Sequence, residues 1–310
     1  MARRWLLGVG FALALAACEP ADPLAGARET CASASTEAEA RLDACTQLIE
    51  SGSLEAGERG AVLASRGDAY AEAGDVTAAL RDFNAALEAA PDTMRAVKGR
   101  AAILIESGQL DAAEPLVERL LASGEFPAEA NDFAGDIALQ RSDLGAAAAA
   151  YDRAIAADST FFHAYASRAA VRMRQQDYDG ALADFDAAIA LNPQLSPALA
   201  GRCWARVQMQ DGDLAAARAD ADAAAAADPR NVQGQLCRGV LQLRAGEWAD
   251  ARASYEAVLE VEPGNPAALF GRGVARRRSG DSDGRADMNQ ARDFEANIGR
   301  AFEQLGVATF

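Results

Sequence analysis

The chain has 310 residues, of which 25% are charged and only 6% are aromatic, and its formal net charge is −16. One compact core rarely grows beyond about 250–300 residues, so two domains or an extended repeat array are expected. The acidic balance argues against unaided nucleic-acid binding, which needs Lys and Arg for the phosphates, and against binding an anionic lipid surface by charge alone.

The N-terminus has the pattern of an export signal. A basic start, MARRW, precedes an apolar run at residues 6–17, which is too short to cross a bilayer of about 30 Å as a helix. This order is typical of a secretory signal peptide. The run ends in LAAC, which resembles the lipobox of bacterial lipoproteins and implies removal of residues 1–17 and lipidation of Cys18. Ordinary signal cleavage after Ala16 is the alternative.

The lipobox resemblance implies a cellular location. Residue Glu19 replaces the Asp that often marks inner-membrane retention of such lipoproteins, so a periplasmic protein anchored to the outer membrane through Cys18 is expected. The inner membrane stays open as an alternative. Residues 18–30 are expected to form a flexible tether, which reaches about 40 Å when extended.

Cysteine counting supports lipidation. Of the five cysteines, four remain if Cys18 carries lipid, and an even number in an exported chain suggests disulfides. Cys31 and Cys45 flank a helix-forming segment, where a bridge would fix an N-terminal helical cap at residues 31–59.

From residue 60 onward the sequence repeats with a period of 34. A small residue recurs at Ala79, Ala113, Ala147 and Ala181, and then at Ala217 and Ala251. Such a period indicates repeats that bury their apolar stripes only against their neighbours.

The repeat resembles the tetratricopeptide repeat. Its marks in the fourth repeat are Tyr165, Ala169, Ala181, Phe185, Ala188 and Pro193. The resemblance implies seven pairs of antiparallel helices, at 60–93, 94–127, 128–161, 162–195, 196–231, 232–265 and a degenerate 266 onward. The expected fold class is all-α: a right-handed superhelical solenoid over residues 60–310, with the N-terminal helical cap and a C-terminal capping helix.

Arginine replaces the family's usual leucine at position 7 of six repeats: Arg66, Arg100, Arg168, Arg202, Arg238 and Arg272. Position 23, on the second helix, is aspartate in three of these repeats: Asp82, Asp184 and Asp220. In the third repeat both positions are alanine. Because a buried arginine needs a partner, we expect structural ion pairs rather than a basic ladder for an acidic ligand. The pairing could lie within one repeat or between two.

Cys203 and Cys237 fall on the first helices of the fifth and sixth repeats, which are expected to run side by side. They occupy positions 8 and 6, because the fifth repeat carries two extra residues. A disulfide between them would connect the two repeats. The alternative is that both are small buried apolar residues.

In this family the first helices line an inner groove. The groove positions are acidic or small in the first half of the chain and do not match the family's carboxylate clamp, so binding of chaperone tails is not expected. In the second half they form an apolar set: Met173, Trp204, Val207, Leu236, Val240, Leu243, Phe270 and Val274. We expect a groove for a protein partner there, with shielding by the chain's own tail as the alternative.

The C-terminal tail has apolar residues at helical spacing: Phe294, Ile298, Phe302 and Leu305. It is expected to form the helix that caps the last repeat.

No catalytic set is apparent. The one histidine, His163, has no clustered ligand pattern around it, and no phosphate-binding loop occurs, so neither an enzyme nor a cofactor or metal is expected. The resemblance implies a non-catalytic scaffold that binds envelope proteins of unknown identity. The alternatives are a binder of a glycan or small apolar ligand in the groove, and a structural spacer.

Overall fold

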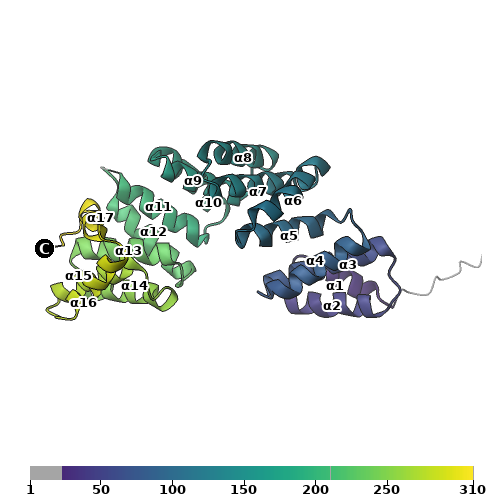
Figure 1. Cartoon of the computed structure of the whole chain (residues 1–310), viewed down its shortest axis with the longest axis horizontal. Coiled ribbons are helices and arrows are strands. Elements are labelled where there is room, and N and C mark those ends of the chain that lie inside the picture. The colour runs from purple at the N-terminus through teal and green to yellow at the C-terminus, as the bar shows by residue number, and fades with distance from the viewer. Residues whose placement is uncertain (1–22, 210, 310) are drawn as a thin grey trace, which may run out of the picture. The chain divides into compact units, whose positions relative to one another are not determined.

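The computed structural model describes residues 23–209 and 211–309, which form seventeen α-helices and no strand (Figure 1). They divide into an N-terminal part, which ends at Gly99, and a C-terminal part, which begins at Arg100, with the boundary inside α5 (Met94–Glu106). Within the described residues, no helix combines the length and apolar character that a membrane crossing requires.

The N-terminal part contains α1 (Ala25–Ala32), α2 (Ala38–Glu50), α3 (Ala56–Glu72) and α4 (Val76–Ala89). Helix α1 packs on α2 and α3, and α3 packs on α4. The tether expected up to residue 30 is too long, because α1 already begins at Ala25. Leu24 and Ala27 pack there against a small core around Cys45 and Leu48, which keeps α1 folded. Residues 18–22 of that tether lie outside the described residues.

A disulfide joins Cys31 at the end of α1 to Cys45 on α2, with a Cα–Cα distance of 4.9 Å. Both cysteines are buried. A short helix such as α1 is marginal by itself, so this bridge holds it on the surface of α2 and α3.

The C-terminal part continues the helix pairs. Its helices are α6 (Leu110–Ser123), α7 (Pro127–Gln140), α8 (Leu144–Ala157), α9 (Phe162–Arg174), α10 (Tyr178–Leu191), α11 (Ser196–Gln208), α12 (Leu214–Ala227), α13 (Val232–Ala245), α14 (Trp248–Val261), α15 (Pro266–Arg278), α16 (Gly284–Phe294) and α17 (Ile298–Gln304). From α7 onward, each helix packs on the next one in the chain up to α16. The first helices of the pairs also contact one another, α7 with α9, α9 with α11, α11 with α13 and α13 with α15. They therefore form one continuous surface, the first-helix face, and the expected all-α architecture of stacked helix pairs is confirmed.

Aspartate side chains start the second helices of four pairs. Each accepts a hydrogen bond from the backbone N–H three residues further on: Asp75, Asp143, Asp177 and Asp213. Such N-caps satisfy one of the free N–H groups at a helix start. They fix the turn inside each pair and so the spacing of the stack.

Aromatic rings from second helices fill the space between neighbouring first helices. Tyr255 of α14 enters between α13 and α15, where Gly239 and Gly271 leave room for it, since a Cβ at either position would clash with the ring. Phe185 of α10 packs against Gly201 of α11 in the same way. These rings bring apolar surface from the second helices close to the first-helix face.

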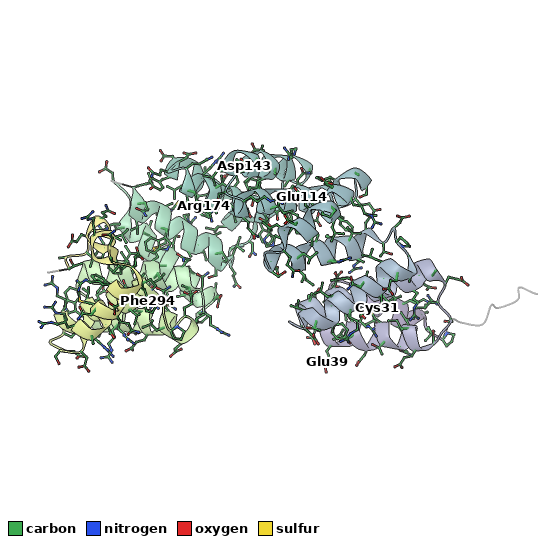
Figure 2. All side chains as sticks on the ribbon, viewed as in Figure 1. Cys31, Glu39, Glu114, Asp143, Arg174 and Phe294 are labelled. Carbon is green, nitrogen blue, oxygen red and sulfur yellow. A yellow bond between two sulfur atoms is a disulfide. The ribbon has the colours of Figure 1, made fainter. Side chains whose placement is uncertain are left out.

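The tail forms two helices. Helix α16 packs on α15 as the second helix of the seventh pair, and α17 follows as the cap and also contacts α15. Phe294, expected in the same stripe as Ile298 and Phe302, is 63% exposed at the end of α16 (Figure 2). The chain leaves the helix at Glu295, which breaks the periodicity, whereas Ile298 and Phe302 are buried.

Candidate functional site

The arginines at position 7 connect neighbouring helix pairs. Nη2 of Arg168 on α9 lies 2.6 Å from Oδ1 of Asp184 on α10, and its Nη1 lies 2.6 Å from Oδ1 of Asp152 on α8. Arg202 repeats this with Asp220 and Asp186, also at 2.6 Å each. Each arginine therefore pairs within its own repeat and with the preceding one.

A second arginine one turn later completes each cluster. Arg172 lies 2.7 Å from the Asp184 carboxylate, and Arg206 contacts Asp220 in the same way. The hydrogen bonds that Arg168 donates to the Asp184 carboxylate raise the pKa of Arg168 above its ordinary value, so the guanidinium stays charged. The geometry supports the structural interpretation, because these guanidinium groups already hold buried carboxylates.

The other arginines at position 7 differ in their ion-pair partners. Arg66 pairs with Asp82 and also donates to Thr46 of α2, and Arg272 pairs with Asp287. Arg238 pairs with Asp222 of the preceding repeat; its own repeat has Ser254 at position 23, which donates to Gln242 instead. Arg100 is partly buried on α5. Sequence reasoning missed Asp152, Asp186, Asp222 and Asp287, although the first two recur with the 34-residue period.

Cys203 and Cys237 form a disulfide that joins α11 to α13, with a Cα–Cα distance of 6.5 Å. Both are fully buried in one cluster with Val207 and Leu241. The two-residue offset between their positions in the repeat does not prevent the bridge.

Six of the eight expected groove residues are buried rather than exposed. They are Val207, Leu236, Val240, Leu243, Phe270 and Val274. Five of these form a core cluster with Ile298, Phe302 and Val307 of the tail. The ring of Phe302 lies 5.0 Å from that of Phe270 and 6.3 Å from that of Tyr255. The expectation of an exposed apolar patch over α13 and α15 is therefore wrong, because the chain's own tail covers these residues.

The other two, Met173 and Trp204, line an open pocket of about 630 Å³ on α9 and α11. Its wall comprises Ala166, Ala170, Met173, Arg174, Phe185, Pro197, Gly201, Trp204, Gln208, Asn231 and Gln233. We call it the α9–α11 pocket. Nε1 of Trp204 donates to the carbonyl oxygen of Gln233 at 3.0 Å, which fixes the indole. Alanine and glycine leave the space, and the exposed Arg174 lies at its edge, at the end of α9 (Figure 2). The volume is in the range of ordinary ligand sites.

The acidic first half of the expected groove contains a carboxyl pair on α7, the buried Asp132 and the half-buried Asp136. The Tyr151 hydroxyl donates to Oδ1 of Asp136 at 2.7 Å. Burial, together with the nearby charges of Asp136 and Glu129, raises the pKa of Asp132 to about 7. In the sequence Asp132 is one of the acidic groove positions of the first half of the chain, and no sequence pattern predicts that its pKa is raised.

His163 is exposed and lies beside the ring of Phe162, with 4.2 Å between the ring centroids. Among residues 23–209 and 211–309, no group of three or more His, Cys, Asp or Glu side chains is placed to hold a metal ion.

Comparison with known families and structures identifies the architecture. The family described as Tetratricopeptide repeat matches residues 65–130, 103–161, 134–196, 204–257 and 238–292, which together span more than half of the chain. The chain therefore belongs to the tetratricopeptide repeat family. Comparison with curated protein sequences yields no match.

Solved structures with the same fold share little sequence with this chain. The APC/C hetero-tetramer Cut9–Hcn1 is 18% identical with a TM-score of 0.62, and the match covers 87% of this chain and 53% of that one. A tetratricopeptide repeat protein from Parabacteroides merdae is 17% identical with a TM-score of 0.52, covering 81% of this chain and all of that one. A thermophilic protein of Thermus thermophilus is 17% identical with a TM-score of 0.51, covering 59% and 99%. These likenesses concern the fold alone.

Proposed function

We propose that this protein is a non-catalytic scaffold that binds another protein through the α9–α11 pocket. The observation that carries the proposal is the pocket itself, an apolar cavity of about 630 Å³ between two first helices with a fixed tryptophan in its wall. Tryptophan is among the side chains that most often dominate binding energy at interfaces. Membership of the tetratricopeptide family supports a scaffold role.

The charged residues support the same interpretation. Buried carboxylates such as Asp184 and Asp220 are held by two arginines each, and Asp136 accepts from Tyr151. The carboxylates that pair with arginine stabilise the stack and are not free to act as catalytic acids or bases.

We also propose that the protein is exported and held at the periplasmic face of the outer membrane by lipid on Cys18. The LAAC sequence supports this, although Cys18 lies outside the described residues. Two disulfides inside the fold also support export, because such bonds form and persist in oxidising compartments.

Replacing Cys18 with Ser tests the anchor. The variant is expected either to appear in the soluble periplasmic fraction or to accumulate with its signal unprocessed, because serine has no thiol for lipidation. Envelope fractionation followed by immunoblotting measures this. If the variant stays in the membrane fraction at its mature size, as the unchanged protein would, the anchor proposal is wrong.

Replacing Trp204 with Ala tests the scaffold. After cross-linking in cells, recovery of the co-purifying protein is expected to fall at least about tenfold, since a hot-spot residue is lost. Trp248→Ala is the matched control, because Trp248 lies on the second helix α14, outside the pocket. An unchanged protein partner together with loss of a co-purifying glycan or apolar molecule would support the small-ligand alternative instead.

A further inference from the structure

The tail of this chain lies on the first-helix face as a peptide would. Ile298, Phe302 and Val307 are buried in one core cluster with Leu236, Val240, Leu243, Phe270 and Val274. After α17 the backbone passes two arginines. The guanidinium of Arg244 lies beside Gly306, and Arg278 donates to the carbonyl oxygen of Ala308 at 3.1 Å. The tail site thus combines an apolar floor, which takes the face of a short helix, with arginines near the backbone that follows it.

The α9–α11 pocket has the same construction 70 residues earlier in the chain. Phe185 corresponds to Tyr255, Met173 to Leu243, Arg174 to Arg244 and Trp204 to Val274. The other wall residues follow the same offset: Ala166 and Leu236, Ala170 and Val240, Pro197 and Ala267, Gly201 and Gly271, and Gln208 and Arg278. Nine of the eleven wall residues therefore have a counterpart in or beside the tail site.

The two sites differ in the size of their side chains. Leu236 and Val240 at the tail site are replaced by Ala166 and Ala170 at the pocket, and Phe270 is replaced by the buried Ala200. Smaller walls leave more room, and the pocket is an open cavity where the tail site is filled. The pocket thus has wall residues and an arginine that correspond to those of the tail site, and it has space for a larger side chain of a bound segment.

We infer that the α9–α11 pocket binds a short amphipathic helix of another protein, similar in chemistry to α17. An aromatic side chain of that helix takes the place of Phe302 and packs on Phe185 and Trp204. The backbone that follows it meets Arg174, as the backbone around Gly306 meets Arg244. This inference rests on the proposed scaffold function and specifies the kind of partner segment.

Charge and position favour this occupant. Arg174 is exposed at the rim, so a carbonyl or carboxylate oxygen at the end of the bound helix would meet a cation there. The pocket also adjoins an interface that the chain already uses, because Trp204 and the tail residue Leu305 both pack against the cluster around Cys203 and Val207. A bound helix would therefore extend the row of apolar contacts that α17 begins.

The test uses a synthetic peptide of residues 296–309 with a photoreactive phenylalanine in place of Phe302, added to the full-length chain. We expect saturable binding by fluorescence anisotropy and cross-links to the segment 166–208. The same peptide carrying Ala instead of Phe302 should bind about 30-fold more weakly, since it lacks the anchor. Arg174→Glu in the protein should weaken binding about tenfold, because it reverses the charge at the rim.

Filling the pocket gives the decisive comparison. Ala170→Phe adds an aromatic ring at an exposed wall position and should abolish binding, whereas Ala183→Phe adds the same ring at an exposed position of α10 and should leave binding unchanged. Circular dichroism melts of both variants check that each remains folded.

Three results would overturn the inference: no saturable binding, binding that Ala170→Phe leaves intact, or cross-links confined to 236–278, which would mean exchange with the chain's own tail. The photoreactive phenylalanine can also be placed at position 302 of the full-length chain. Cross-links between intact chains that rise with protein concentration would then make a second copy the occupant, and would also overturn the inference. If the peptide fails while Trp204→Ala still removes the co-purifying protein, the scaffold function stands and only this partner class is wrong.

Discussion

Replacing Asp184 with Ala is expected to lower the free energy of unfolding by roughly 3 kcal/mol, because it leaves Arg168 and Arg172 facing each other inside the stack. The Asp184 residue is only 3% exposed, and both guanidinium groups lie within 2.7 Å of its carboxylate. Removing one partner of a buried ion pair leaves the other charges buried without an opposite charge. Urea unfolding followed by circular dichroism at neutral pH measures the change.

Asp152→Ala is the matched control, since it removes the other carboxylate that Arg168 contacts. Asp152 is exposed, and exposed ion pairs contribute about 1 kcal/mol or less. The double variant Arg168→Ala with Asp184→Ala should cost less than the two single changes together, as expected for residues in one network. Equal losses for Asp184→Ala and Asp152→Ala would contradict the role assigned to the buried pair.

The same cluster shows how far sequence reasoning reached. The combination of Arg168 and Asp184 recurs in two other repeats, and both residue types are absent from the third repeat, where Ala134 and Ala150 stand instead. That co-variation predicted an ion pair between helices. It could not reveal the second arginine or the contact to Asp152, because charged residues on solvent-facing and interhelical positions look alike in a single sequence.

The groove prediction failed for a different physical reason. Leu236, Val240 and Phe270 are apolar at inner positions whether a partner or the chain's own tail covers them, so their pattern cannot identify the occupant. Periodicity suggested that Phe294 would join this contact. A break at Glu295 leaves it exposed and lets α17 fold back separately. The course of a chain reversal depends on tertiary packing rather than on local spacing.

The α9–α11 pocket was found only in part from the sequence. Met173 and Trp204 were identified, but the cavity is made by Ala166, Ala170 and Gly201, which lack bulk. Small residues in a repeat protein usually mark close helix packing, so a missing side chain gives no separate signal. The correspondence with the tail site became visible only once the structure placed Phe302 against Tyr255 and Phe270.

The carboxyl group of Asp132 is expected to make the stability of this protein fall as the pH rises through neutrality. Burial raises its pKa from 3.8 to about 7, and Asp136 and Glu129 add like charge beside it. Between about pH 4 and pH 7 the folded state holds a proton that the unfolded state has released. Stability from this group is therefore fully present below about pH 4 and is lost as the pH rises through 7.

Asp132→Asn should remove this dependence, because the amide stays neutral at every pH. A pKa displacement of about three pH units corresponds to at most about 4 kcal/mol, so the variant should be clearly more stable than the unchanged chain at about pH 8. The two should be nearly equal at about pH 4. Urea unfolding across that range measures the difference, and Asp111→Asn, at a fully exposed carboxylate, is the control.

The neighbouring groups decide how the result is interpreted. Asp136 also has a raised pKa, mainly from burial, while the hydrogen bond from Tyr151 opposes the shift. Asp132 is already protonated over most of the range from about pH 4 to 7, so Asp132→Asn leaves the charge beside Asp136 nearly unchanged there, and the smaller slope that Asp136 contributes should remain. If the pH slope of the Asp132→Asn variant between about pH 4 and 8 equals that of the unchanged chain, the proton is held elsewhere. A clearly smaller slope would mean that near neutral pH Asp132, on the first-helix face at α7, exchanges a proton, so the charge presented there depends on pH.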